Sequence, residues 1–424
     1  MLSTLKNAWK IPDIRKKINY TMLMLLIFRL GSSIPVPYMN KEVISGIFES
    51  TEGGILQFLD LMAGGTFSNF SIFATNIYPY ITASIVIQLL TIAIPRLEEL
   101  AKEGDEGRKK IGRYTRYIAI LLATIQAIGY TLGLFSDALE TDSNLQKVIV
   151  VITLVAGTSF LIWIGERITE KGIGNGISLI IFVGIISRLP GELINAIRLI
   201  RIGQLSIIKA LIFAIVFLAI IAIVVALQEG ERKIPVQYAK RVVGRKMYGG
   251  QSTHIPIKVS MSGVMPVIFA SSLLALPQTI TLFTKGGVSD WITKYLTPQG
   301  SVGIWVYSIL NIILIMFFTY FYTAIQFNTV EYAQNLQQNG GFIPGIRPGR
   351  PTSEALNRTV SRITFVGGLS LAILASLPII LSKIFGMNVN FGGTAIIIVV
   401  GVALETVKQI ESQMLMRHYK GFLN

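Results

Sequence analysis

The chain of 424 residues has no cysteine and only two histidines, and 14% of its residues are charged. The absence of cysteine excludes disulfides and thiolate metal sites, but it is compatible with either side of a membrane. A typical soluble domain is about a quarter charged, so this scarcity argues against a water-soluble enzyme. Hydrophobic residues make up 52% of the chain, and a surplus of Lys and Arg gives a net charge of +15. A chain both apolar and basic is typical of membrane spans joined by basic loops.

Stretches without ionisable residues locate the expected spans, each of which needs about 20 residues. They are 61–95, 117–136, 148–165, 172–187, 210–228, 259–284, 295–330, 363–382 and 384–404. A further apolar stretch, 18–37, carries Arg29, whose charge costs about 2.5 to 3.5 kcal/mol at mid-membrane unless it lies near an end or has a partner. Basic residues precede this stretch as in a signal peptide, but no small-residue cleavage pattern follows, so we expect a retained helix. The sequence therefore predicts an all-α polytopic membrane protein with ten transmembrane helices.

The distribution of positive charge predicts the orientation. Most of the 38 Lys and Arg residues fall in segments on the same side as the N-terminus. By the positive-inside rule both termini are then cytoplasmic. Segment 188–209 is an exception on the outer side, and its amphipathic run from Leu193 to Ile202 predicts a short interfacial helix.

The connection 189–206 divides the chain into two halves, 1–188 and 207–424, with five spans each. An odd number of spans per half places the second half upside down relative to the first. Inverted repeats put a pathway at the interface between the halves, near the bilayer midplane. This symmetry is inferred from the span count alone, because the halves share no convincing sequence identity.

The stretch 61–95 is too long for one perpendicular helix, and Gly64-Gly65 with neighbouring polar residues interrupts it. Irregular backbone at membrane depth is tolerated only where protein or a water-filled cavity surrounds it. One interpretation is a re-entrant half-helix at about 55–70 followed by a span over 72–90. The other is an outer loop followed by one ordinary helix, and both remain open at this point.

Isoleucines recur at helical spacing in two of the stretches. Ile77 and Ile81 share one helix face, as do Ile177 and Ile181. Such pairs also arise by chance in apolar helices. A ring of branched apolar side chains at the waist of a pore would seal it against ions by dewetting.

Several classes of function lack their residues here. Ion-coupled transporters normally carry buried carboxylates, and the charge-free stretches have none. The His-Glu-x-x-His, Gly-x-Ser-x-Gly and phosphate-loop motifs are also missing. We expect no cofactor and no catalytic or metal-binding residues, and an ion-coupled secondary transporter of small solutes remains the alternative function.

Two long segments on the cytoplasmic side, 229–258 and 331–362, are candidate docking surfaces. The first holds Arg241, Arg245 and Lys246, and its alternation around Pro235 to Val243 indicates a β-hairpin. Basic loops beside a membrane most often contact anionic lipid, and docking of RNA or an acidic protein is the competing interpretation. In the second, three prolines and two glycines between Pro344 and Pro351 fix a turn that presents Arg347 outward, with Arg350 beside it.

The chain resembles the bacterial SecY family, whose members form the channel subunit of the Sec protein translocon. The resemblance covers essentially the whole chain, and its motifs follow the family's order. They are Phe28-Arg29-Leu30-Gly31, Ser71-Ile72-Phe73-Ala74, Pro79-Tyr80-Ile81-Thr82-Ala83-Ser84, Gly172-Ile173-Gly174-Asn175-Gly176-Ile177-Ser178, Tyr238-Ala239-Lys240-Arg241, Gln251-Ser252-Thr253-His254, Pro266-Val267-Ile268-Phe269-Ala270-Ser271-Ser272 and Gly345-Ile346-Arg347-Pro348-Gly349.

This resemblance implies a central hourglass pore between two five-helix halves, hinged at 189–206. The family's hydrophobic pore ring would fall on Ile77, Ile81, Ile177, Ile181, Ile268 and Ile398, and the last position could instead be Ile397. The family's plug corresponds to about 55–70, which favours the re-entrant interpretation. The plug residues would be Leu61, Gly64, Gly65, Phe67 and Asn69. Asn69 departs from the family, because some relatives carry an arginine there.

The resemblance also implies a lateral gate between 79–90 and 266–283. Its residues would be Thr82, Ile85, Gln126, Ser271 and Leu276. Leu276 is apolar at a position that is polar in the family, so the polar gate cluster is only partly matched. The segments 229–258 and 331–362 correspond to those that meet the ribosome and the SecA motor ATPase.

The function implied is a passive, gated conduit of the general secretory pathway. Unfolded preproteins with signal peptides would cross it or leave sideways into lipid. The implied partners are SecE, SecG, SecA, the ribosome and anionic lipids, and the implied location is the bacterial cytoplasmic membrane. We expect no enzymatic activity, because the energy would come from SecA or from the translating ribosome.

Overall fold

The computed structural model describes residues 2–50, 60, 64–140, 143–203, 206–238, 241–243, 246–248, 252–281, 286–297, 302–385 and 393–420. Each of the ten apolar stretches overlaps a helix within this part of the chain. These helices are α2 (Pro12–Gly31), α5 (Tyr78–Ala93), α7 (Asp105–Gly129), α8 (Asn144–Lys171), α9 (Gly176–Arg201), α10 (Ile207–Glu229), α11 (Met265–Ile280), α13 (Gly303–Gln326), α15 (Arg350–Phe385) and α16 (Gly393–Lys420).

Six helical stretches of the described residues are long and apolar enough to cross a membrane, and a seventh counts if α5 and α6 (Pro95–Lys102) form one bent span. Shorter apolar stretches lie in α9 and α11, at Gly176–Gly191 and Met265–Pro277. The smaller elements are α1 (Leu2–Lys10), α3 (Lys41–Ser50), α12 (Gly287–Tyr295), the π-helix Tyr130–Leu134 and the 3₁₀-helix Ser136–Ala138. The prediction of a mostly helical chain with many apolar spans is confirmed.

The span predicted from residue 72 begins later, because residues 64–77 form turns and α5 starts only at Tyr78. Phe70 and Asn76 have φ of 41° and 51°, a left-handed backbone that interrupts a right-handed helix. At its other end α5 bends by 101° into α6. The bend falls at Ile94, whose φ of −111° and ψ of 112° are extended, as expected before Pro95.

Two other predicted boundaries are wrong. The separate interfacial helix over 193–202 is the continuation of α9, which runs through Pro190 to Arg201. The predicted loop 331–362 is mostly ordered structure: α14 (Thr329–Gln338), strand β5 (Gly341–Phe342) and the first turns of α15. Asn328 initiates α14, since its Oδ1 accepts hydrogen bonds from the backbone N–H groups of Val330 and Glu331 at 3.2 and 3.4 Å.

The predicted β-hairpin in the segment 229–258 is confirmed, but its strands have other bounds than the sequence suggested. β1 (Glu231–Tyr238) pairs antiparallel with β4 (Ser252–Lys258), so that Glu231 lies opposite Lys258. β5 pairs with the other edge of β1, which brings the two cytoplasmic segments together. A second antiparallel pair, β2 (Arg241–Val243) with β3 (Lys246–Tyr248), lies within the connection between β1 and β4.

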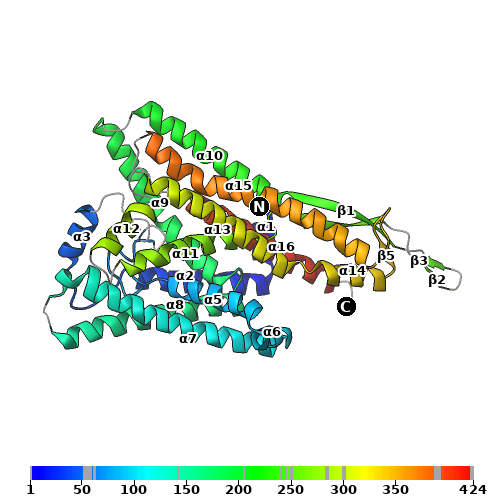
Figure 1. The fold of residues 1–424 in the computed structure, drawn as a ribbon, viewed down its shortest axis with the longest axis horizontal. Coiled ribbons are helices and arrows are strands. Elements are labelled where there is room, and N and C mark those ends of the chain that lie inside the picture. Colours follow the sequence, from blue (N-terminus) through cyan, green and yellow to red (C-terminus); the bar gives the residue numbers. More distant parts are fainter. Residues whose placement is uncertain are drawn as a thin grey trace.

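The helices run along the long axis of the molecule, and the strands project with α14 from one end (Figure 1). The C-terminus lies toward that end, the N-terminus lies nearer the middle of the long axis, and α3 and α12 lie at the other end (Figure 1). Helices α5, α7 and α8 of the first half lie on one side, and α10, α13 and α15 of the second half lie on the other (Figure 1). The halves meet where α5 packs on α11 and α9 packs on α16. The largest buried apolar cluster contains residues from both of these contacts.

Candidate functional site

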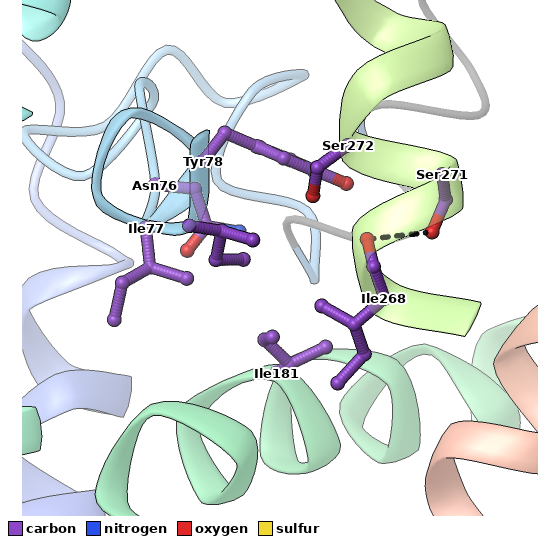
Figure 2. A pocket seen from close by; sticks show the side chains of 8 residues that line it. Asn76, Ile77, Tyr78, Ile181, Ile268, Ser271 and Ser272 are labelled. Atoms are coloured by element: carbon purple, nitrogen blue, oxygen red, sulfur yellow. Dashed lines mark hydrogen bonds between the residues drawn. The ribbon is translucent and has the colours of Figure 1, made fainter. Parts of the chain in front are cut away.

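A narrow waist lies where the two halves meet. Ile77, at the start of α5, and Ile81, one turn later, face Ile181 of α9 and Ile268 of α11 around a cavity of about 10 Å³ (Figure 2). Each of these four side chains is at most 4% exposed. A cavity of this size has room for about one water molecule, so these side chains leave almost no open space between them.

Residues with polar side chains complete the wall of this small cavity. They are Asn76, Tyr78, Ser271 and Ser272 (Figure 2). The Ser271 hydroxyl donates to the carbonyl oxygen of Val267 at 2.6 Å. The waist thus combines four branched apolar side chains with a few polar groups from α11 and from the turn before α5.

A much larger cavity, of about 930 Å³, adjoins the waist and shares Ile81, Ile181 and Ile268 with it. Its walls carry charged and polar groups, among them Arg113 and Arg116 of α7 and Glu166 of α8. A guanidinium nitrogen of Arg116 lies 3.2 Å from the Glu166 carboxylate. A wide chamber with both polar and apolar walls that adjoins a narrow apolar constriction has the shape of one half of an hourglass.

The two remaining ring candidates lie elsewhere. Ile177 lies one turn before Ile181 on α9 and lines the larger cavity. Ile398 and Ile397 of α16 are both fully buried in the same apolar cluster as the waist, so burial does not choose between them. Among the described residues, four of the six predicted ring positions line the waist cavity.

The predicted plug is only partly within the described residues, and Leu61 lies outside them. Residues 64–70 form turns rather than the expected half-helix. Gly64 and Gly65 have φ of 68° and 87°. Phe67 is 1% exposed, and its ring packs edge-on against Tyr130 at 4.9 Å between centroids. Asn69 is exposed, and its Nδ2 donates to the carbonyl oxygen of Gly65 at 3.0 Å.

Two charged residues at this segment, Asp60 and Arg188, were not among the predicted site residues, and a third, Arg29, was expected to need a partner. Asp60 is 2% exposed and forms an ion pair with Arg188 of α9. Arg29 of α2 donates from Nη1 to the carbonyl oxygen of Gly64 at 3.0 Å, which supplies the partner that its position in a span requires. Asp60 directly precedes the charge-free stretch 61–95, and Arg188 directly follows the charge-free stretch 172–187. Their places at the ends of apolar stretches are the one feature of the sequence that could have pointed to them.

The predicted gate residues lie on helices that pack together. Thr82 and Ile85 are buried on α5, which packs against both α7 and α11. Gln126 of α7 is buried, and its Oε1 accepts no hydrogen bond from the described residues. Ser271 is buried on α11, and Leu276 is half-buried one turn further along.

Of the predicted docking residues, Arg347 and Arg350 are both exposed. Gly345 and Gly349 flank Arg347 with φ of 83° and 95°, and the Thr352 hydroxyl donates to the carbonyl oxygen of Arg347 at 2.8 Å. These features hold the turn that presents Arg347. Arg241 and Lys246 are known only as backbone positions in β2 and β3, and Arg245 lies outside the described residues.

Comparison with known proteins identifies relatives over the full length. The sequence profile of the SecY family matches residues 71–407. A protein of Halalkalibacterium halodurans named protein translocase subunit SecY is 46% identical over 436 aligned positions, which cover all of both chains.

Solved structures share the fold at lower identity. One described as a protein-conducting channel has a TM-score of 0.69 and 21% identity, and the match covers 97% of both chains. Sec61 in a canine ribosome–channel complex from the endoplasmic reticulum has a TM-score of 0.64 and 18% identity over 97% of both chains. The predicted fold class, a ten-helix membrane channel fold with a plug, is confirmed.

Proposed function

The chain belongs to the SecY family, and we infer from this that it is a protein-conducting channel that passes unfolded preproteins across a membrane. The observation that carries the inference is the cavity of about 930 Å³ that narrows to the isoleucine waist between the two halves. The alternative, an ion-coupled transporter of small solutes, has no support from the relatives.

We propose that the waist is the resting seal. Ile77, Ile81, Ile181 and Ile268 surround space for about one water molecule, and a constriction lined by branched apolar groups excludes ions by dewetting. Ile177 and Ile398 would join the ring when the helices move apart. Apolar side chains make no directional bonds, so the ring can deform around a passing chain and close again.

The contact between α5 and α11 supports a lateral gate at this interface. Parting these helices would expose a segment in the channel to lipid. Ten Leu or Ile residues gain roughly 3 to 6 kcal/mol on entering lipid, while each central Arg or Lys costs about 2.5 to 3.5 kcal/mol. An opening at α5 and α11 would therefore let the substrate sort itself by its own hydrophobicity. Thr82, Ile85, Gln126, Ser271 and Leu276 are the residues proposed to line this opening.

The proposed setting is the bacterial cytoplasmic membrane, with both termini and the strand-bearing end in the cytoplasm. The proposed units are the halves 1–188 and 207–424, hinged at 189–206. SecE and SecG are proposed as companion subunits, with anionic lipid around the basic surfaces. We propose that the channel itself is passive and that SecA or a translating ribosome supplies the energy.

Docking of those partners is proposed at the strand-bearing end. β1, β4, α14 and the start of α15 share one small apolar cluster, which includes Val236, Ile257, Leu336 and Leu356. Segments 229–258 and 331–362 therefore form a single unit on which Arg347 is exposed. An arginine held on a rigid turn suits bidentate recognition of a carboxylate or phosphate.

Translocation of a preprotein into vesicles that contain the channel with SecE and SecG, in the presence of SecA, tests this function. We expect wild type to translocate and Arg347→Glu to lose at least about tenfold in rate, because reversal of the charge repels an acidic partner surface. Lys294→Glu is the matched control, since Lys294 is an exposed cation on α12 at the opposite end. Equal rates for wild type and Arg347→Glu would contradict the docking proposal, and no translocation by wild type would contradict the channel function.

A further inference from the structure

A buried carboxylate organises the segment 64–70. One oxygen of Asp60, Oδ1, accepts hydrogen bonds from the backbone N–H groups of Phe67 at 3.1 Å and Ser68 at 2.7 Å. The backbone N–H of Gly65 also donates to the Asp60 carbonyl oxygen, at 3.0 Å. Asp60 therefore fixes the shape of this segment from within.

The second carboxylate oxygen of Asp60 points to a different helix. It forms the ion pair with Nη2 of Arg188, near the Pro190 of α9. The same Nη2 donates to the hydroxyl of Ser68 at 2.9 Å. The Arg188 guanidinium thus bonds to both Asp60 and Ser68, which lie at the two ends of the turn. These bonds attach the turn to α9.

The backbone of the segment also lies unusually close to α9. A Cβ added to Gly64 would come within 2.5 Å of the Cα of Gly184, and one added to Gly65 would lie 3.4 Å from the Arg188 guanidinium. The Gly64 carbonyl oxygen accepts from Arg29 on its other side. The segment 64–70 therefore packs closely between α2 and α9.

We propose that Asp60 and Arg188 form an ionic latch that holds segment 64–70 against α9 and keeps the plug seated in the resting channel. The proposal rests on the channel function above and assigns two positioning residues to it. The Asp60 side chain is 2% exposed and that of Arg188 is 25% exposed, so removing the guanidinium leaves a buried carboxylate without its cation. The latch therefore favours a segment 64–70 that is either seated, with the pair formed, or released, with the Asp60 carboxylate hydrated.

Cysteine accessibility in vesicles tests the latch, and the natural chain contributes no cysteine of its own. Thr66 is fully buried in the seated segment, so Thr66→Cys reports release through alkylation by a membrane-impermeant maleimide. We expect Arg188→Gln to raise the alkylation rate at least about tenfold, given the cost of leaving the buried Asp60 carboxylate without its cation. Asp60→Asn should raise the rate less, because the Arg188 side chain is 25% exposed and keeps its hydrogen bond to Ser68. Arg188→Lys keeps the charge but loses the planar fork, so its rate should fall between those of Arg188→Gln and wild type.

Two controls separate the latch from a general effect on folding. Arg198→Gln removes an exposed cation from the same helix and should leave the rate at Thr66→Cys unchanged. Ala372→Cys, fully buried on α15, should stay protected in every variant. The latch is overturned if Arg188→Gln leaves Thr66→Cys protected, or if it exposes Ala372→Cys equally. Either result can occur in a channel that still translocates, so it is distinct from failure of the channel function.

Discussion

The isoleucine waist and the segment 64–70, both proposed to close the path, are held together by opposite chemistry. The waist is formed by the apolar side chains of Ile77, Ile81, Ile181 and Ile268, which line one small cavity and belong to one buried apolar cluster. The segment is held by an ion pair and by hydrogen bonds of 2.7 to 3.1 Å to one carboxylate. Apolar contact is non-directional and scales with area, whereas charge-assisted bonds require one geometry. The comparison indicates a seal that deforms gradually beside one that is either seated or released.

The largest expected effect comes from making the waist polar. Replacing all four waist isoleucines by serine removes the surface that excludes water. We expect the ion conductance of vesicles containing the resting channel to rise by at least about tenfold, because serine makes the constriction both wider and polar, so that it stays wet. Conductance is measured by ion flux across the vesicle membrane without substrate.

A matched control replaces the same four isoleucines by valine. Valine keeps an apolar, branched side chain and costs about 0.5 to 1.5 kcal/mol per site in packing. We expect the conductance of this variant to stay near that of wild type. If the serine variant is as tight as the valine variant, the waist is not the seal.

A smaller effect is expected where the segment contacts α9. Gly64→Ala places a side chain at φ of 68° and against the backbone of Gly184. Left-handed strain and overpacking together cost about 2 to 5 kcal/mol, which should shift the segment toward release and speed alkylation at Thr66→Cys. Gly104→Ala shares the positive φ, at 78°, but meets nothing within 4 Å. Equal alkylation rates in both variants would show that contact with α9 does not seat the segment.

The sequence predicted the spans well because exclusion of charge is a local property. Each apolar stretch overlaps a described helix. Helix ends were predicted less well. The start of α5 depends on left-handed residues at Phe70 and Asn76, which are not glycine and leave no mark in the sequence. The extension of α15 back to Arg350 lies in a charged, soluble segment that a search for apolar stretches cannot detect.

The candidate site was also predicted only where its features are local in the sequence. Helical spacing pairs Ile77 with Ile81, but their meeting with Ile181 and Ile268 depends on how separate helices pack, and only the resemblance suggested it. The ion pair of Asp60 with Arg188 joins residues 128 positions apart. In the sequence, charged residues between apolar stretches indicated only where each span ends. Which of these charged residues contact each other depends on the tertiary fold and cannot be predicted from the sequence.

The most direct test of a polypeptide path through the waist is a crosslinking map with a stalled preprotein that carries one cysteine. Single cysteines at 77, 81, 181 and 268 should each crosslink to the stalled chain, because the path between the halves passes them. Ile315→Cys is the control, since Ile315 is fully buried on α13 and does not line the waist cavity. Crosslinks at the four waist positions and none at 315 are the predicted result. A stalled chain that misses all four positions would contradict a path through the waist.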